Sequence, residues 1–204
     1  MAGGLAVGVP FRARQDAAWT PLFDGVSLEG WEQTSFGGEG PVRVRDGMIV
    51  LEFGDPLTGI TWTREVPRMN FEIALDAARL SGSDFFCGLT FPVAESYCSF
   101  IVGGWGGTTV GLSNLDGMDA SENETSREMR FEEGRWYGIR VAVRAHDIRA
   151  WIDDEEVVNV ATAGRRIGIR PEVEPSIPLG IASYRTRAGL RNIRMRRIAA
   201  GGEA

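Results

Sequence analysis

The chain has 204 residues, which is long enough for one sizeable sandwich or barrel and short for two domains. Hydrophobic residues make up 43% of it, and its 27 glycines and 9 prolines favour many short strands joined by turns over long helices. The formal net charge of -6 argues against a nucleic-acid partner, and no apolar run in the sequence is long enough to span a membrane.

The first 18 residues mix small, apolar and basic side chains. They contain no continuous apolar stretch and so do not form a complete signal peptide. We expect a leader, or the trimmed remnant of one, over residues 1–18, without ordered structure. One β-sandwich domain is expected over residues 19–198, followed by a tail over residues 199–204.

Alternating apolar and polar residues predict strands over residues 71–77, 139–143 and 148–152. The last two are separated by a turn at His146-Asp147 and are typical of a hairpin. Asp46-Gly47 predicts another hairpin, of type I′, because both residues tolerate a positive φ. Antiparallel strands with frequent turns predict an all-β protein built as a two-sheet antiparallel β-sandwich.

The two cysteines lie in segments that are apolar at successive positions, residues 85–91 and 97–102, as in strands covered on both faces. A hairpin turning at Pro92-Val93 would place Cys87 opposite Cys98, and a disulfide could then form. Two buried thiols are the equally weighted alternative. No cluster of His and Cys accompanies them, which argues against a metal site built on thiolates.

A glycine-flanked tryptophan, Trp105 in residues 103–107, lies outside the strand pattern. The glycines allow the backbone to approach a ligand closely, and a sugar ring stacks its C–H face on an indole. Trp105 is therefore a candidate sugar platform, and Trp62 is a second one. The alternative for each is a tryptophan packed in the core, as most are in a sandwich.

The segment that follows, residues 113–133, is long, polar and rich in acids, a pattern typical of a functional or disordered loop. Asp116, Asp119 and Glu122 offer the hard oxygen ligands that suit Ca²⁺. Glu122 and Glu124 could instead form a catalytic carboxylate pair, since positions i and i+2 of a strand share a face. A solvated acidic loop is the alternative to both. We also expect ligand contacts from Asn114, Asn123, Arg127 and Tyr184.

All 22 basic residues are arginines, and six of them lie between positions 185 and 197. Alternation with Ile193 and Met195 places most of these six on one outward face, so a solvated sheet surface is expected. Bidentate recognition of a carboxylate or phosphate is the alternative.

Two segments near the ends of the domain carry a family resemblance. They are PLFDGVSLEGW at 21–31 and GLRNIRMRRI at 189–198. They resemble the Leu-Phe-(Asn/Asp)-Gly opening and the Phe-Arg-Asn-Ile closing strand of the 3-keto-disaccharide hydrolase domain family. Gly134-Arg135-Trp136-Tyr137 and Trp151-Ile152-Asp153-Asp154 resemble further motifs of that family. The resemblance implies a concanavalin A-like jelly roll in an exported protein, periplasmic or extracellular, and the use of arginine for every basic residue favours a bacterial source.

The resemblance also implies chemistry on carbohydrates. Active members of that family hydrolyse, or eliminate across, glycosidic bonds of sugars oxidised at C3, using acidic and His side chains and in some cases a divalent metal. Where the family has Glu, Gln and His, this chain aligns Cys98, Ala182 and Tyr184. We therefore expect a carbohydrate-recognising or carbohydrate-active domain. The alternatives are an enzyme acting on keto-glycosides through a rebuilt site with Glu122 or Glu124 as base, and a non-catalytic interaction scaffold.

Overall fold

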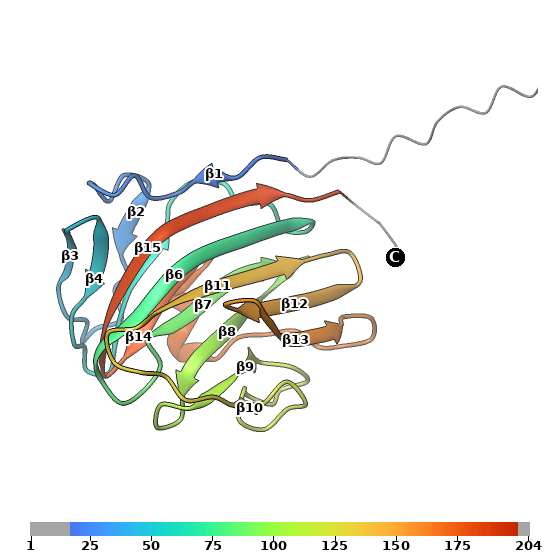
Figure 1. Ribbon diagram of the computed structural model, residues 1–204. Coiled ribbons are helices and arrows are strands. Elements are labelled where there is room, and N and C mark those ends of the chain that lie inside the picture. The colour runs from blue at the N-terminus through green and yellow to red at the C-terminus, as the bar shows by residue number, and fades with distance from the viewer. Residues whose placement is uncertain (1–16, 200–204) are drawn as a thin grey trace, which may run out of the picture.

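Two antiparallel β-sheets pack face to face in the computed structural model, which describes residues 17–199 (Figure 1). The predicted two-sheet antiparallel sandwich is thereby confirmed. Of the leader and tail expected from the sequence, residues 1–16 and 200–204 lie outside the described residues.

The larger sheet carries both ends of the described chain. Its strands are β1 (Thr20–Pro21), β3 (Val42–Arg45), β4 (Met48–Leu51), β6 (Phe71–Gly82), β11 (Trp136–Val143), β12 (Asp147–Ile152), β13 (Glu155–Ala161) and β15 (Thr186–Arg197). They are ordered β13-β12-β11-β6-β15-β4-β3, with β1 paired to β15.

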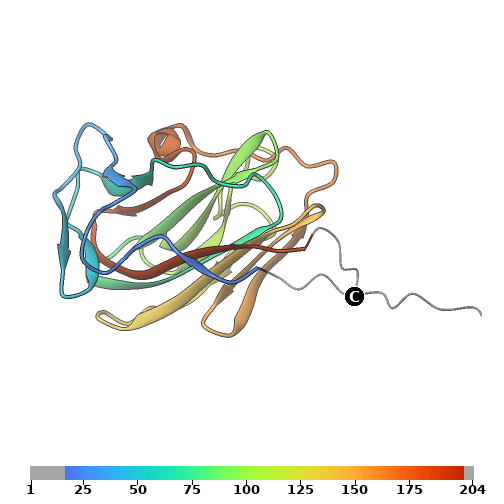
Figure 2. The same ribbon diagram turned by 90° about the horizontal axis from the view of Figure 1, so that it is seen from above.

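The smaller sheet has seven strands and presents its outer face to a short helix. Its strands are β2 (Trp31–Gln33), β5 (Leu57–Trp62), β7 (Cys87–Val93), β8 (Ser96–Gly104), β9 (Thr109–Ser113), β10 (Arg127–Glu128) and β14 (Gly180–Tyr184). They are ordered β10-β9-β8-β7-β14-β5-β2. The 3-10 helix η1 (Pro171–Ser176) packs against β5 and β14, on the side away from the larger sheet (Figure 2). Over residues 17–199, no helix is long and apolar enough to cross a membrane.

Period-2 alternation sorts the strand residues as predicted. β6 buries Phe71, Ile73 and Leu75 between the sheets. The predicted hairpin of β11 and β12 is confirmed, with Val143 opposite Ile148. The type I′ turn is also confirmed, because Asp46 and Gly47 have φ angles of 52° and 77° between β3 and β4.

Tryptophan side chains separate into core and surface roles. Trp31 and Trp62 are buried and meet edge to face, with ring centroids 5.1 Å apart. Trp62 is therefore a core residue, and its candidacy as a sugar platform is wrong. Trp136 is half-buried on the outer face of the larger sheet, under the guanidinium of Arg191 at 4.0 Å from the ring centroid.

The outward placement of the C-terminal arginines is confirmed along β15. Arg191 Nε lies 3.2 Å from Asp76 Oδ2, and Arg187 Nε lies 2.9 Å from Glu52 Oε2. These arginines pair with acids of neighbouring strands on a partly solvated surface, so their charge is largely compensated there.

Of the two alternatives for the cysteines, the disulfide is wrong, because Cys87 and Cys98 are free and fully buried. The β7–β8 hairpin turns at Ala94-Glu95 rather than at Pro92-Val93, since Val93 pairs with Ser96. This later turn sets Cys98 opposite Phe91 and Cys87 opposite Val102. The alternative of two buried thiols is confirmed.

Burial raises the pKa of both thiols to about 12, so we expect neither to react with Ellman's reagent in the folded protein at pH 8. Both should react after unfolding in guanidinium chloride. Between roughly pH 9 and 12 the unfolded thiols ionise while the folded ones stay protonated, so the free energy of unfolding should fall as the pH rises. Denaturation at pH 8 and pH 10, with a Cys87→Ala/Cys98→Ala variant as control, measures this slope. Rapid thiol reaction of the folded protein would contradict the prediction.

Candidate functional site

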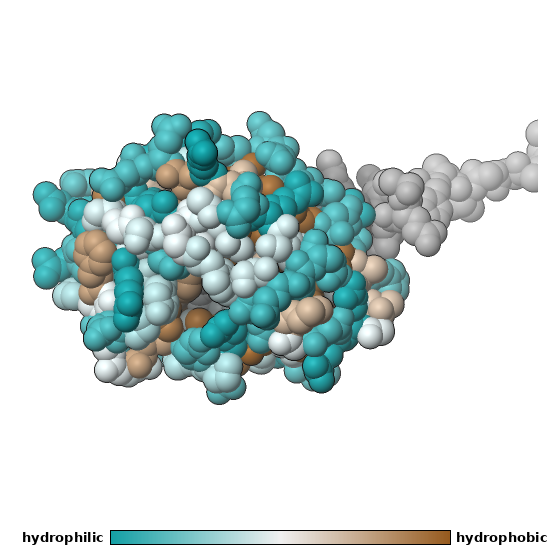
Figure 3. Space-filling view, turned by 90° about the horizontal axis from the view of Figure 1, so that it is seen from below, coloured by the Kyte–Doolittle hydropathy of each residue, from teal (hydrophilic) through white to brown (hydrophobic). Residues whose placement is uncertain are grey.

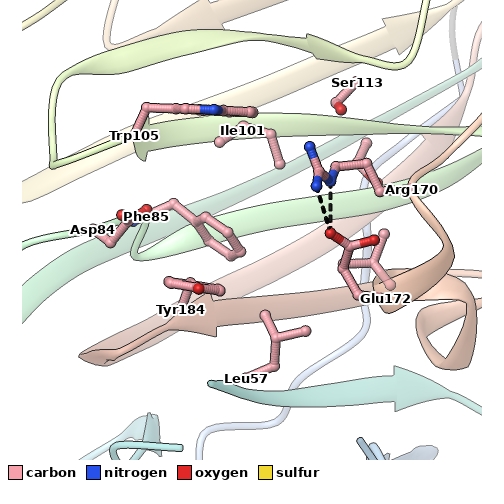
Figure 4. Close-up of a pocket in the computed structure, with 11 residues that line it drawn as sticks. Leu57, Asp84, Phe85, Ile101, Trp105, Ser113, Arg170, Glu172 and Tyr184 are labelled. Carbon is pink, nitrogen blue, oxygen red and sulfur yellow. Dashed lines mark hydrogen bonds and ion pairs between the residues drawn. The ribbon is translucent and has the colours of Figure 1, made fainter. Parts of the chain in front are cut away.

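A cavity of about 230 Å³ opens on the outer face of the smaller sheet (Figure 4). Ser99 and Ile101 of β8 line it, whereas Cys98 and Phe100 of the same strand point into the core between the sheets. The volume lies below the range of about 300–1,000 Å³ that holds drug-sized ligands, so the cavity suits a small molecule or one ring of a larger one. The lining residues are Leu57, Asp84, Phe85, Ser99, Ile101, Trp105, Ser113, Arg170, Glu172, Val173 and Tyr184.

Three aromatic residues border the cavity. Trp105, 41% exposed, follows β8, and its indole lies along one wall beside Ile101 (Figure 4). Phe85 and Tyr184 lie across from it, with ring centroids 5.7 Å apart. Leu57 adds an apolar contact below them, so much of the lining is apolar, as in most small-ligand sites.

One ion pair supplies the fixed charge at the opposite end of the cavity. Arg170 Nε donates to Glu172 Oε1 at 2.7 Å, and Arg170 Nη1 donates to Asp119 Oδ2 at 2.8 Å. Desolvation works against ionisation of Glu172, but its backbone hydrogen bond and Arg170 outweigh this and lower the pKa of its carboxyl. The hydrogen bond to Glu172 in turn raises the pKa of Arg170. Both groups are therefore charged at neutral pH, and the single positive charge faces two negative ones.

Hydroxyl groups offer neutral hydrogen-bonding positions along the strands. Ser99 Oγ lies 2.8 Å from Thr90 Oγ1, and Ser113 Oγ donates to Asn114 Oδ1 at 2.8 Å. A hydroxyl has one donor and two acceptor positions, so each of these serines keeps some capacity for a ligand.

Sequence reasoning found two cavity residues and missed others. Trp105 was found through its flanking glycines, and Tyr184 through its place in the closing motif. Arg170 and Glu172 were missed because they flank Pro171 at the start of the short helix η1, where no strand periodicity marks them. The same face carries Ala182, which packs with Leu57 and Val173, whereas Cys98, aligned with the family's Glu, lies in the core.

The acidic segment does not assemble the expected calcium ligands. Asp116 Oδ2 binds Arg165 Nη1 at 2.6 Å, a hydrogen bond that lowers the pKa of Asp116. Asp119 binds Arg170, as described above, and Glu122 is exposed. Among residues 17–199, no group of three or more His, Cys, Asp and Glu side chains is placed to hold a metal ion. The expected site is wrong because arginines, rather than a shared cation, compensate Asp116 and Asp119.

The expected carboxylate pair is also displaced from the cavity. Glu122 and Glu124 lie in a succession of turns rather than on a strand, so the rule that i and i+2 share a face does not apply. Glu124 binds Arg165, and neither glutamate lines the cavity. An acid–base role for this pair at the cavity therefore has no geometric basis.

Asn123 has a structural role. It is buried, and its Nδ2 donates to the carbonyl oxygens of Leu112 at 2.8 Å and Asp119 at 2.7 Å. Its Oδ1 accepts from the backbone amide and the hydroxyl of Thr125, at 2.9 and 2.6 Å. The amide is committed to the loop, and the expectation that it contacts a ligand is wrong.

The remaining two expected contact residues also lie outside the cavity lining. The backbone amide of Asn114 donates to the Gly168 carbonyl oxygen at 2.6 Å, and the backbone amide of Gly168 donates to the Asn114 carbonyl oxygen at 3.1 Å. Arg127 is exposed on β10, with its Nη1 3.7 Å from Glu155 Oε1. Asn114 thus ties the acidic segment to the segment that carries Arg170, while Arg127 faces solvent.

Solved structures share this fold at low sequence identity. A Bacillus licheniformis beta-glucanase matches with a TM-score of 0.58 at 9% identity, covering 92% of this chain and 100% of that one. Domain 4 of AbnA, a GH43 extracellular arabinanase from Geobacillus stearothermophilus solved with arabinotriose, matches with a TM-score of 0.56 at 12% identity, covering 92% and 94%. The carbohydrate binding module CBM66 from Bacillus subtilis matches with a TM-score of 0.52 at 13% identity, covering 80% and 93%.

Comparison with curated proteins found no match. The model of one protein family matches residues 18–196, which is nearly all of the sandwich described above. That match includes the opening motif, the closing motif as far as residue 196, and every residue that lines the cavity. The chain therefore belongs to the family of 3-keto-alpha-glucoside-1,2-lyase-like domains.

Proposed function

We propose that this protein binds a carbohydrate in the cavity on the smaller sheet, with Trp105 as the platform for one sugar ring. The observation that carries the proposal is the partly exposed indole of Trp105, facing Phe85 and Tyr184 across a cavity that also offers hydroxyl groups. An indole matches the C–H face of a sugar, and polar side chains match its hydroxyls. Family membership and the similarity to a carbohydrate binding module support the same ligand class.

The charges around the cavity favour an uncharged sugar. Arg170 is paired with Asp119 and Glu172, and Asp84 adds another carboxylate at the lining. The local charge is therefore negative, and a uronate or sugar phosphate would meet like charges at short range, which disfavours its binding.

The test compares methyl glycosides of neutral hexoses with those of the matching hexuronic acids by titration calorimetry. We expect the wild-type protein to prefer the neutral glycoside by about tenfold or more. Glu172→Gln removes one negative charge and the anionic partner of Arg170 Nε and Nη2, while Asp119 still binds Nη1, so this preference should shrink. Glu174→Gln, on the exposed side of η1 and outside the lining, is the matched control and should leave the preference unchanged. Failure to bind any glycoside would overturn the proposal, and equal affinity for both classes would overturn the charge argument.

Catalysis at this site has weaker support than binding. Glu172 has a lowered pKa and is held by Arg170, which makes it a poor proton acceptor at neutral pH. Asp84 uses both carboxylate oxygens to bind backbone amides. Turnover of a 3-keto-glucoside, lost in Glu172→Gln, would show that the cavity performs chemistry as well.

An interaction scaffold without a sugar ligand is also less well supported. Among the described residues, the exposed large hydrophobic side chains are Val26, Phe53, Trp105 and Met118, from four separate segments. Seen from below, hydrophobic residues are scattered among hydrophilic ones, with no broad apolar patch on that face (Figure 3). Export from a bacterial cell stays a prediction based on the family.

A further inference from the structure

A buried arginine lies behind the cavity. Arg79, on β6 of the larger sheet, is 8% exposed, and the acceptors that its side chain binds among the described residues are backbone carbonyl oxygens rather than carboxylates. Its Nη2 donates to the carbonyl oxygens of Asp84 at 3.2 Å, Gly103 at 3.3 Å and Gly107 at 2.8 Å. A buried charge needs such partners, and here they all belong to the two segments that carry Asp84 and Trp105 to the cavity.

Asp84 joins the same two segments from the cavity side. Its Oδ2 accepts from the Gly106 amide at 3.1 Å, and its Oδ1 accepts from the Phe85 amide at 2.8 Å. Thr186 fixes the Asp84 backbone, because its Oγ1 accepts from the Asp84 amide at 3.0 Å and donates to the Asp84 carbonyl at 3.2 Å. Asp84 is therefore fixed through both its backbone and its side chain.

Trp105 lies between these fixed points in an unusual backbone conformation. Its φ is 48°, in the left-handed region that tryptophan rarely adopts, and such a conformation persists only where its surroundings determine it. The flanking glycines allow the Arg79 side chain and the Ser83 backbone to approach this turn. A Cβ on Gly103 would lie 2.6 Å from Arg79 Nη2, and one on Gly107 would lie 2.9 Å from the Ser83 carbonyl oxygen.

We infer that Arg79 and Asp84 are positioning residues that hold the Trp105 indole in its ligand-binding orientation. From the protein interior, Arg79 binds the carbonyl oxygens of Gly103 and Gly107, which lie before and after Trp105. From the surface, Asp84 binds the backbone amide of Gly106. A platform fixed before the ligand arrives loses less side-chain freedom on binding, which raises affinity. The inference rests on the proposed sugar-binding function for its consequence, but the orientation of Trp105 can be observed without any ligand.

The experiment uses the full chain labelled with 5-fluorotryptophan and observed by fluorine NMR. The chain has six tryptophans, and the Trp105 resonance is identified by its absence in Trp105→Phe. In Asp84→Ala we expect this resonance to shift and change width while the other five stay in place. Asp153→Ala is the matched control, because Asp153 Oδ1 accepts from the Gly138 amide in a turn away from the cavity. It should leave the Trp105 resonance unchanged.

Arg79→Met should produce the same spectral change. Arg79→Lys keeps a charge and up to three donors, so its Trp105 resonance should lie closer to that of the wild type. If Arg79→Met does not fold, Asp84→Ala decides alone. Affinity for a neutral methyl hexoside should fall about tenfold in Asp84→Ala. An unchanged Trp105 resonance in folded Asp84→Ala overturns the inference. A displaced resonance in a protein whose wild type binds no sugar supports the positioning role and overturns the proposed function instead.

Discussion

Replacing Trp105 with alanine is expected to lower the affinity for a neutral sugar by roughly 30-fold or more. A large aromatic side chain that packs against a ligand often contributes about 2 kcal/mol or more, and each 1.4 kcal/mol corresponds to about tenfold in affinity. Trp105 meets this description because it lines the cavity and has a partly exposed indole available for stacking. The ring is lost in Trp105→Ala, whereas the hydroxyls and the Arg170–Glu172 pair stay in place.

Titration calorimetry with the methyl glycosides measures this loss, and two variants serve as controls. Trp105→Phe keeps a smaller ring and should retain part of the affinity. Phe53→Ala removes another exposed aromatic residue that does not line the cavity, and it should bind as the wild type does. Wild-type affinity in a folded Trp105→Ala variant would show that the sugar binds elsewhere.

Replacing Asn123 with alanine is expected to lower the free energy of unfolding by about 2–4 kcal/mol. The buried carboxamide bonds the carbonyls of Leu112 and Asp119 and both polar groups of Thr125. Alanine removes the acceptor of the buried Thr125 amide and a donor to the Leu112 carbonyl oxygen, and each buried group left unsatisfied costs about 1–3 kcal/mol.

Urea denaturation followed by circular dichroism measures this change. Glu122→Ala, one residue away and exposed, is the matched control and should stay within about 0.5 kcal/mol of the wild type. A residue that bound ligand from the surface would behave in the opposite way, losing affinity with little loss of stability. Wild-type stability in Asn123→Ala would therefore contradict the structural role.

The acidic segment influences the cavity indirectly. Asn123 anchors the turn that carries Asp119, and Asp119 holds Arg170 at the cavity. Asp116 binds the Arg165 side chain and the Arg166 backbone amide, and so fixes the segment that leads to Arg170. The carboxylates thus act as supports for one cavity side chain.

Much of the fold could be predicted from local sequence patterns. Residues on alternate positions of a strand face opposite sides, so the alternation over residues 71–77 was enough to identify the buried face of β6. Asp46-Gly47 specified its turn, because few residues tolerate a positive φ at both central positions. The glycines around Trp105 marked it as a candidate site residue, because glycine allows the backbone to approach a ligand closely.

The cysteine pairing and the composition of the site depended on the tertiary structure. A turn placed at Ala94-Glu95 instead of Pro92-Val93 changed every cross-strand partner in the β7–β8 hairpin and separated Cys87 from Cys98. The acidic segment offered oxygen ligands, but Arg165 and Arg170 reached them from a distant part of the chain.

The sequence by itself determined the sandwich, its family and the exposed position of Trp105, because strand periodicity, turn residues and terminal motifs are local. Only the tertiary structure decided that Arg170 and Glu172 line the same cavity as Trp105, and that Arg79 reaches the Gly107 carbonyl from the other sheet. Such contacts depend on how two sheets and an irregular segment pack, and no local pattern encodes which distant charges will meet.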